Sequence, residues 1–489
     1  MPVPPEWAIA ETHISTVVFS GDVAYKWYKP VKTAFLDHST VEQRRVGTLR
    51  EVELNRRLAP DVYLGTAQLV SDEGEVLDHL IRMRRLPADR RLSALVHTAE
   101  AESQVDAIAR QLAVFHAGAR RSPEIDAEAT APVMADRWEQ NLRELGDFTD
   151  LGVTHEQVRT MRQLAASYLA GRNRLFEERL AGSWACDGHG DLLADDIFCL
   201  ADGPRILDCL DFDDRLRWGD VLADLSFLMM DLERLGRADL SSRLLRAYRE
   251  LTGERHPASL ADHYVALRAL IRAKVDFLRA RQAGDDDAVE RAVADGGAHL
   301  AQALAHLRAG EVRLVLVGGA PGAGKSAVAD RVGAAMNWVV LGSDELRKQR
   351  LGVPVADDLS SAPFAGAYEP EAVAAVYREM LVEAERLLCL GESVVLDASW
   401  LQAARRSEAR DLAAVAHATL VELECHTPDD ERERRIAQRR AQGASASDVT
   451  VEAARHLVAG RDPWPTAVPL DTSGPVGDAV ARAVDVING

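Results

Sequence analysis

The first ninety residues alternate between apolar and polar positions in short runs. Residues 13–19 and 23–28 show the two-residue period of strands, and a Ser-Gly-Asp sequence between them is typical of a hairpin turn. A charged amphipathic helix is expected at 40–59, and two further strands at 62–70 and 76–83. These elements predict a small lobe that is rich in strands.

The period changes to that of helices over residues 92–308. Pro123 and Pro132 are expected to break the helices, because proline lacks the backbone N–H that a helix interior needs. Two short strands, near 197–200 and 205–208, interrupt the helical pattern. A small lobe of strands followed by a large helical lobe is the layout of a two-lobed, protein-kinase-like α+β domain.

Another pattern begins near residue 310. Four apolar runs, at 313–317, 338–341, 393–396 and 420–423, read as buried strands with helical segments between them. Strand–helix alternation is typical of parallel βαβ units, so an α/β domain with a parallel sheet is expected here.

The chain therefore contains two predicted domains, which fits a length of 489 residues. The kinase-like domain is expected at 1–300 and the α/β domain at 311–489, with the boundary in the Ala-rich stretch 295–310. The two halves show different patterns and no internal repeat, so a duplication is not expected.

Composition and charge exclude several classes of protein. The chain has 77 acidic and 58 basic residues and a net charge of −19, which disfavours general binding of nucleic acid or anionic membranes. It contains no apolar run of about 18 residues that would span a membrane. Its five cysteines form no CxxC pair, which is typical of a reducing compartment, so we expect a cytoplasmic protein without disulfides or structural zinc.

A phosphate-binding motif follows the first apolar run of the second half. The sequence from Gly319 to Ser326, GAPGAGKS, fits GxxxxGK[ST] between a strand and a helix. Lys325 is informative because only six of the 58 basic residues are lysines, and it is expected to reach the β and γ phosphates of ATP. The Ser326 hydroxyl is expected to ligate Mg²⁺. The backbone amides that cradle the phosphates are expected from Gly319, Gly322, Ala323 and Gly324.

Further polar residues of the second half follow its strands. Asp397 ends the third apolar run, where a carboxylate approaches the magnesium shell in P-loop proteins. The segment 431–440 has five arginines in ten residues. It is either a lid that closes over the phosphates or a solvated helix face, as most charge runs are.

Residues 311–489 resemble the small P-loop kinases that are grouped with gluconate kinase, polynucleotide kinase and zeta toxins. The resemblance rests on the Walker A loop, on SDxxRK at 343–348 and on VVLDAS at 394–399. In such kinases the aspartate of the Ser-Asp pair often orients or deprotonates the acceptor hydroxyl, which implies that role for Asp344. The resemblance also implies an acceptor-holding role for Arg347 and lid roles for Arg435 and Arg439.

The first half contains a second set of kinase-like residues. Asp191 in a His-Gly-Asp sequence is followed by Asp196, and the next apolar run ends in Asp208. Phosphoryl transfer to a hydroxyl needs a carboxylate that accepts the proton and ligands for Mg²⁺. Upstream, Val-Ala-Tyr-Lys26 reads like the strand that brings a lysine to the α and β phosphates, and Glu51 on the next helix is its expected partner. The alternative is a coincidental set of surface acids.

Residues 10–300 resemble the aminoglycoside phosphotransferase-like kinases. The tandem with the P-loop half looks like the bacterial bifunctional aminoglycoside phosphotransferase/ATP-binding proteins. The resemblance implies that Asp191 is the catalytic base, Asp208 the main magnesium ligand, Lys26 and Glu51 the nucleotide clamp, and Met83 the start of the hinge along adenine. The chain departs from the family pattern at Asp196, where the second metal ligand is usually asparagine.

The sequence thus predicts an ATP- and Mg²⁺-dependent phosphotransferase with two nucleotide sites. The expected acceptor is a hydroxyl of a small metabolite such as a sugar, an amino sugar or an aminoglycoside-like antibiotic. One alternative is that one half is a nucleotide-binding pseudokinase that regulates the other, and a second is that the P-loop half is a toxin-like nucleotide-sugar kinase. We expect neither a membrane nor a nucleic acid as partner, and the oligomeric state stays open.

Overall fold

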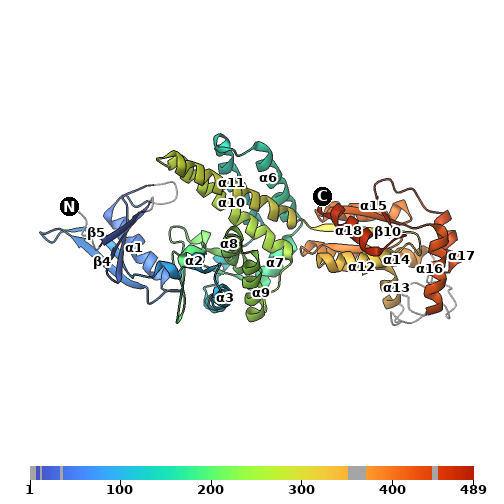
Figure 1. The fold of residues 1–489 in the computed structure, drawn as a ribbon, viewed down its shortest axis with the longest axis horizontal. Coiled ribbons are helices and arrows are strands. Elements are labelled where there is room, and N and C mark those ends of the chain that lie inside the picture. The colour runs from blue at the N-terminus through green and yellow to red at the C-terminus, as the bar shows by residue number, and fades with distance from the viewer. Residues whose placement is uncertain (1–6, 12–13, 33–36, 351–369, 443–449) are drawn as a thin grey trace. The chain divides into compact units, whose positions relative to one another are not determined.

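The computed structural model describes residues 7–11, 14–32, 37–350, 370–442 and 450–489. It divides into two compact units, both drawn in Figure 1. Unit 1 comprises Met1–Arg162, Phe176–His256 and Ala261–Leu307, and unit 2 comprises Gln163–Leu175, Pro257–Leu260 and Arg308–Gly489. No described helix is long and apolar enough to cross a membrane.

Unit 1 begins with an antiparallel sheet of strand order β1-β2-β3-β5-β4. The strands are β1 (Trp7–Glu11), β2 (Ser15–Ser20), β3 (Val23–Tyr28), β4 (Tyr63–Val70) and β5 (Val76–Arg84). The sequence predicts four of them but not β1, a short edge strand that pairs only with β2. The register places Lys26 of β3 opposite Ile81 of β5.

Helix α1 (Val41–Asn55) packs against β5 of this sheet and starts at a capping box formed by Thr40 and Gln43. It ends four residues before the predicted end at 59. Just after the helix, the Arg56 guanidinium donates to the carbonyl oxygen of Tyr63 at 2.8 Å, at the start of β4.

The rest of unit 1 is mainly helical, as predicted. The helices that follow along the chain are α2 (Leu92–Leu95), α3 (Ala101–Gly118), α4 (Pro123–Glu128), α5 (Ala131–Leu145), α6 (His155–Ala170), α7 (Asn173–Ala181), α8 (Val221–Arg234), α9 (Ala238–Thr252), α10 (Ala258–Gln282) and α11 (Asp286–Ala309). Pro123 and Pro132 lie in the first turns of α4 and α5. They begin helices rather than break them, because the first turn of a helix leaves its N–H groups unpaired in any case.

Two small ribbons and short 3-10 turns lie between these helices. One ribbon pairs the predicted strands β7 (Ile197–Leu200) and β8 (Gly203–Ile206), and the other pairs β6 (Ala185–Asp187) with β9 (Trp218–Asp220). The 3-10 turns are η1 (Ala88–Arg90), η2 (Gly146–Leu151), η3 (Ala194–Asp196) and η4 (Asp214–Leu216). The second ribbon is not predicted because three residues carry too little periodicity.

Unit 2 contains a parallel sheet of order β11-β12-β10-β13-β14, as the alternation of strands and helices predicts. Its strands are β10 (Arg313–Gly319), β11 (Val339–Gly342), β12 (Val394–Asp397), β13 (Thr419–His426) and β14 (Val468–Asp471). Its helices are α12 (Lys325–Met336), α13 (Ser343–Arg350), α14 (Pro370–Cys389), α15 (Ala403–Val415), α16 (Asp429–Gln442), α17 (Val451–Ala459) and α18 (Val476–Asn488). Only β14 is not predicted among these strands.

The central strand β10 is buried along its whole length. On one face of the sheet, Val315 and Val317 pack with Val328 of α12 and Ala483 of α18 in one apolar cluster. The rigid sheet therefore fixes the loop between β10 and α12, which carries the phosphate-binding motif.

Candidate active sites

Three charged side chains meet in unit 1, each from a different element. The Lys26 Nζ atom of β3 lies 2.9 Å from Glu51 Oε1 of α1 and 3.1 Å from Asp208 Oδ1, which follows β8. Asp208 has a φ of 61°, a conformation that is uncommon for residues with a Cβ atom and frequent at functional sites. The Lys26 ammonium lowers the pKa of Asp208, whereas burial raises the pKa of Glu51. The predicted clamp and the predicted metal ligand thus lie in contact.

Two further predicted carboxyl groups lie near Asp208. Burial, with a smaller contribution from Asp208, raises the pKa of Asp191 to about 6. Burial, followed by the negative charges of Asp208 and Asp191, raises the pKa of Asp196 to about 8. The fold therefore gathers three acids that repel one another, an arrangement that a divalent cation relieves.

The loop that carries Asp191 is fixed from behind by Asp224 of α8. The Asp224 carboxylate accepts hydrogen bonds from the backbone N–H groups of His189 at 2.9 Å and Gly190 at 2.7 Å, and from His116 Nε2 at 2.9 Å. Despite burial, the hydrogen bond and charge of His116 hold the pKa of Asp224 well below its usual range. Asp224 is therefore an anchor of the loop and not a base.

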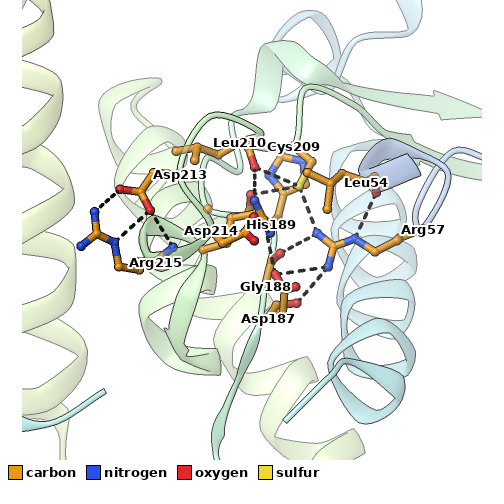
Figure 2. A network of polar contacts seen from close by, with 12 residues as sticks. Leu54, Arg57, Asp187, Gly188, His189, Cys209, Leu210, Asp213, Asp214 and Arg215 are labelled. Carbon is orange, nitrogen blue, oxygen red and sulfur yellow. Dashed lines mark hydrogen bonds and ion pairs between the residues drawn. The ribbon is translucent and has the colours of Figure 1, made fainter. Parts of the chain in front are cut away.

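A second anchor is Arg57, which follows α1 (Figure 2). Its guanidinium donates to the carbonyl oxygens of Leu54 at 3.0 Å, Asp187 at 3.1 Å and Gly188 at 2.8 Å, and contacts the Cys209 Sγ atom at 3.1 Å. The contacts join the end of the helix that carries Glu51 to both the His-Gly-Asp loop and the residue after Asp208. The sequence gives no sign that distinguishes this arginine from its neighbour.

Tyr28 and Asp211 extend the cluster and were also missed. The Tyr28 hydroxyl lies 2.6 Å from Glu51 Oε2 and 2.6 Å from Asp211 Oδ2. Burial raises the pKa of Asp211. Tyr28 follows Lys26 by two residues and so lies on the same face of β3, which is the one signal that sequence analysis offers.

Met83, the predicted start of the hinge, lies in β5 opposite Ala24 of β3. Its partly buried side chain packs against an apolar cluster that includes Val52, Phe198 and Leu207. Leu207 precedes Asp208, so this cluster supports the acidic site from the side of the sheet.

In unit 2 the glycine loop follows β10 as predicted. Gly319, Gly322 and Gly324 have φ values of 130°, 85° and 90°, which residues with a Cβ atom rarely adopt. A Cβ atom on Gly319 would lie 2.5 Å from the Cys425 carbonyl oxygen. Ala323 is buried, and its carbonyl oxygen accepts a hydrogen bond from the Thr472 hydroxyl.

A cavity of about 550 Å³ opens at this loop. The predicted site residues that line it are Gly322, Gly324, Lys325, Ser326, Asp344, Arg347, Asp397 and Arg435. Gly319 and Ala323 are not among the lining residues and act behind the loop. Most of the second predicted site is therefore brought together in one cavity.

The charged residues of this cavity differ in how they are held. Arg347 donates to Asp344 Oδ1 at 2.6 Å. Arg435 donates to the carbonyl oxygen of Thr472 at 2.9 Å and to Glu431 at 2.7 Å. The side chain of Arg439, the other predicted lid arginine, lies outside the described part of the chain.

Asp397 fits the role of a magnesium ligand. Burial raises its pKa, while the Lys325 charge and a hydrogen bond with Ser326 act in the opposite direction. Its Oδ1 atom is buried and has no hydrogen-bond partner among the described residues. A buried carboxylate oxygen without a partner is costly unless a ligand completes it.

No group of three or more His, Cys, Asp or Glu side chains is arranged to hold a metal in the described ranges. A kinase site does not need one, because Mg²⁺ usually binds one or two carboxylates together with phosphate oxygens and water. Asp196 with Asp208 in unit 1, and Asp397 with Ser326 in unit 2, supply such incomplete sets.

Sequence analysis did not single out four polar residues that line the same cavity, Tyr377, Ser399, Gln438 and Thr472. The Tyr377 hydroxyl lies 3.1 Å from Ser399 Oγ, and Thr472 faces the loop from the end of β14. Tyr377 lies in the middle of α14 and gives no periodic signal. Ser399 follows Asp397 by two residues and is the last residue of the segment VVLDAS, but nothing in that segment assigns it a role.

Several known proteins are similar to this chain or to parts of it. A family model described as an AAA domain matches residues 314–463, the part that contains the glycine loop. Two solved structures with similarity are a sugar kinase from Janibacter sp. HTCC2649 (18% identical, covering 36% of this chain and 95% of that chain, TM-score 0.29) and a choline/ethanolamine kinase family protein from Mesorhizobium loti (15% identical, 62% and 92%, TM-score 0.37). Similarities this low say nothing more about the chain.

Curated relatives extend over nearly the whole chain. The uncharacterized proteins Rv2004c of Mycobacterium tuberculosis and Mb2027c of Mycobacterium bovis are each 40% identical over 479 residues, which is 98% of this chain and 95% of each relative. Both units are thus present in these relatives. The chain belongs to the family of these mycobacterial proteins.

Proposed function

We propose that each unit transfers the γ-phosphoryl group of ATP to a hydroxyl of a small metabolite, in two separate sites. The observation that carries the proposal is the cavity of unit 2, where Lys325, Asp344 and Asp397 line one space with the glycine loop. Phosphoryl transfer requires a group that binds the phosphates, a carboxylate that accepts the hydroxyl proton, and a ligand for the metal ion.

In unit 2, Lys325 and the loop amides bind the phosphates, and Ser326 with Asp397 would hold Mg²⁺. Mg²⁺, when bound, neutralises charge on the transferred phosphoryl group. Asp344 accepts the proton of the acceptor hydroxyl, and its ion pair with Arg347 orients it. Buried Tyr377 narrows the cavity beside them.

In unit 1, Lys26, oriented by Glu51, binds the phosphates, and Asp208 with Asp196 would hold Mg²⁺. Asp191 accepts the hydroxyl proton. Its raised pKa of about 6 leaves it ionised at neutral pH and makes it a stronger base than an ordinary aspartate. This mechanism predicts activity that falls as the pH drops below about 6.

Transfer of ³²P from ATP to sugars, amino sugars, aminoglycosides and nucleosides tests the proposal with the full chain. Asp191→Asn should lower transfer by unit 1 on the order of 10²–10⁴-fold, the usual range for general acid–base catalysis, without loss of ATP binding. Lys325→Ala should remove transfer by unit 2 alone. Each acceptor should thus respond to one substitution, and an acceptor that responds to neither would contradict the assignment of sites.

A second candidate function is that unit 1 senses nucleotide and regulates unit 2. The mutual repulsion of Asp191, Asp196 and Asp208 favours it, because extra negative charge beside the phosphates slows transfer. ATP binding by unit 1 without transfer to any acceptor, combined with an effect of Asp208→Ala on transfer by unit 2, would support this alternative.

A further inference from the structure

A cationic face of α10 lies beside the catalytic loop of unit 1. Arg268 and Arg272 are one helical turn apart, so they project from the same side of the helix. Arg268 donates to the carbonyl oxygen of Ala223 at 3.1 Å and covers the Phe227 ring at 4.0 Å. Both partners belong to α8, so this face of α10 rests on α8.

The same stretch of α8 reaches the loop that carries Asp191. Asp231, near the end of α8, accepts a hydrogen bond from the backbone N–H of Ala194 at 2.7 Å. Burial raises the pKa of both Asp231 and Asp191, and Arg272 lies close enough to both carboxyl groups for its charge to act in the opposite direction. The α10 face therefore borders the place where the acceptor hydroxyl must approach Asp191.

The two arginines differ in what they are free to bind. Arg268 is buried and already engaged by Ala223 and Phe227. Arg272 is partly buried, and no hydrogen bond or ion pair joins its side chain to another residue of the described chain. A guanidinium carries five N–H donors and matches a carboxylate or phosphate with two parallel hydrogen bonds.

We propose that Arg272 selects an acceptor that carries an anionic group, such as a sugar acid, and holds that group while the acceptor hydroxyl faces Asp191. The inference rests on the phosphotransferase function proposed for unit 1. It assigns unit 1 a substrate charge opposite to that of a cationic aminoglycoside, because a cation beside Arg272 would be repelled.

Three probes of one ring skeleton test the charge preference: glucuronate, glucose and glucosamine. Their binding to the full chain is measured by calorimetry with Mg²⁺ and a non-hydrolysable ATP analogue present, so the result does not depend on transfer. Glucuronate should bind most tightly, and Arg272→Gln should weaken its binding on the order of 10- to 100-fold while leaving glucose unchanged. Arg272→Lys should recover part of the lost glucuronate affinity, because lysine keeps the positive charge but lacks the planar guanidinium that donates two parallel hydrogen bonds.

Arg279→Gln is the matched control, since Arg279 lies on the same helix but is exposed and paired with Asp276. It should bind all three probes as the unchanged chain does. Equal binding of the three probes, no binding of any, or a glucuronate affinity that Arg272→Gln does not change overturns the proposal. If Arg272 only tunes the base, Arg272→Gln raises the pKa on the acidic limb of kcat/KM equally for every acceptor, which also overturns it. Loss of phosphoryl transfer with the glucuronate preference intact would refute the proposed function and not this inference.

Discussion

At the scale of single residues, the predicted site of unit 1 contains three carboxyl groups whose negative charges repel one another. The motif places Asp191, Asp196 and Asp208 in sequence, but the protonation of Asp196 depends on burial and on its neighbours. Its raised pKa means that Asp196 holds a proton at neutral pH when no metal is bound. A metal ion must displace that proton.

This competition predicts how Mg²⁺ binding varies with pH. Because a carboxyl with a pKa of about 8 must ionise to ligate, Mg²⁺-dependent binding of an ATP analogue to unit 1 should tighten about tenfold per pH unit between pH 6 and 8. Asp196→Asn should flatten that slope, because an amide has no proton to lose. Titration calorimetry of the full chain with Lys325→Ala, which weakens the second site, measures it.

Asp195→Asn provides the control for this slope. The Asp195 carboxylate already accepts hydrogen bonds from Ser93 and Arg91, and its side chain is 69% exposed. In this variant Mg²⁺-dependent binding should tighten with pH just as steeply, with the pH range of the change shifted only slightly downward. If Mg²⁺-dependent binding does not tighten with pH in the unchanged chain, or still does so in Asp196→Asn, then Asp196 is not a ligand that releases a proton.

At the scale of elements, a histidine joins three helices of unit 1. His306 of α11 lies 2.7 Å from Asp262 of α10 through Nδ1 and 2.6 Å from Glu233 of α8 through Nε2. Burial alone would lower its pKa, but these two hydrogen bonds and charges raise it to about 9. The imidazolium therefore links the last helix of unit 1 to the helix that carries Asp231.

The raised pKa makes this link dependent on pH. Since the folded pKa exceeds the unfolded value near 6.5, the stabilisation is complete below about pH 6.5 and is lost as the pH rises through 9. His306→Gln should lower the free energy of unfolding of unit 1 at pH 6.5 on the order of 2–3 kcal/mol and much less at pH 10. Urea denaturation at both pH values measures the difference.

The exposed His97 offers a control in the same unit. His97→Gln should leave the free energy of unfolding nearly unchanged at both pH values, because solvated surface substitutions have small effects. A His306→Gln loss that is equally large at pH 6.5 and 10 would mean that packing, and not charge, sets the stability of this helix junction.

At the scale of the whole molecule, unit 2 includes residues from before the P-loop domain. The Arg172 guanidinium is buried and donates to the carbonyl oxygens of Ala416 at 2.6 Å and His417 at 3.3 Å. The Ser259 hydroxyl donates to the carbonyl oxygen of Gly391 at 2.7 Å. A fragment that starts at 308 lacks these donors and leaves carbonyl oxygens without them.

We therefore predict that the fragment 308–489 folds but is less stable than unit 2 in the full chain. Arg172→Met keeps most of the buried stem and removes the donors, so it should destabilise unit 2 by about 1–3 kcal/mol. Arg482→Met, at an exposed position of α18 in the same unit, should have little effect. Scanning calorimetry of the full chain measures the melting temperature of unit 2 in each variant. Equal melting temperatures for both variants would contradict the role of Arg172.

Much of the fold and half of the site geometry could be predicted from the sequence. Each predicted strand of the parallel sheet is present, and Lys26 meets Glu51 as its motif implies. Strand β6 escaped because three residues define no period, and β14 escaped because Pro469 within it argues against a strand. The starts of α4 and α5 were misread as breaks, because a proline in the first turn looks the same in sequence as one in the interior.

The sequence alone determined those features that depend on contiguous residues. The glycine loop is one strand, one turn and one helix start, so its backbone geometry follows from local residue types. Only the tertiary structure decided which side chains, distant from one another in sequence, are buried together in a region of low dielectric constant. Arg57 and Asp211 make contacts with segments more than a hundred residues away, and long-range packing and burial set these interactions rather than any local pattern.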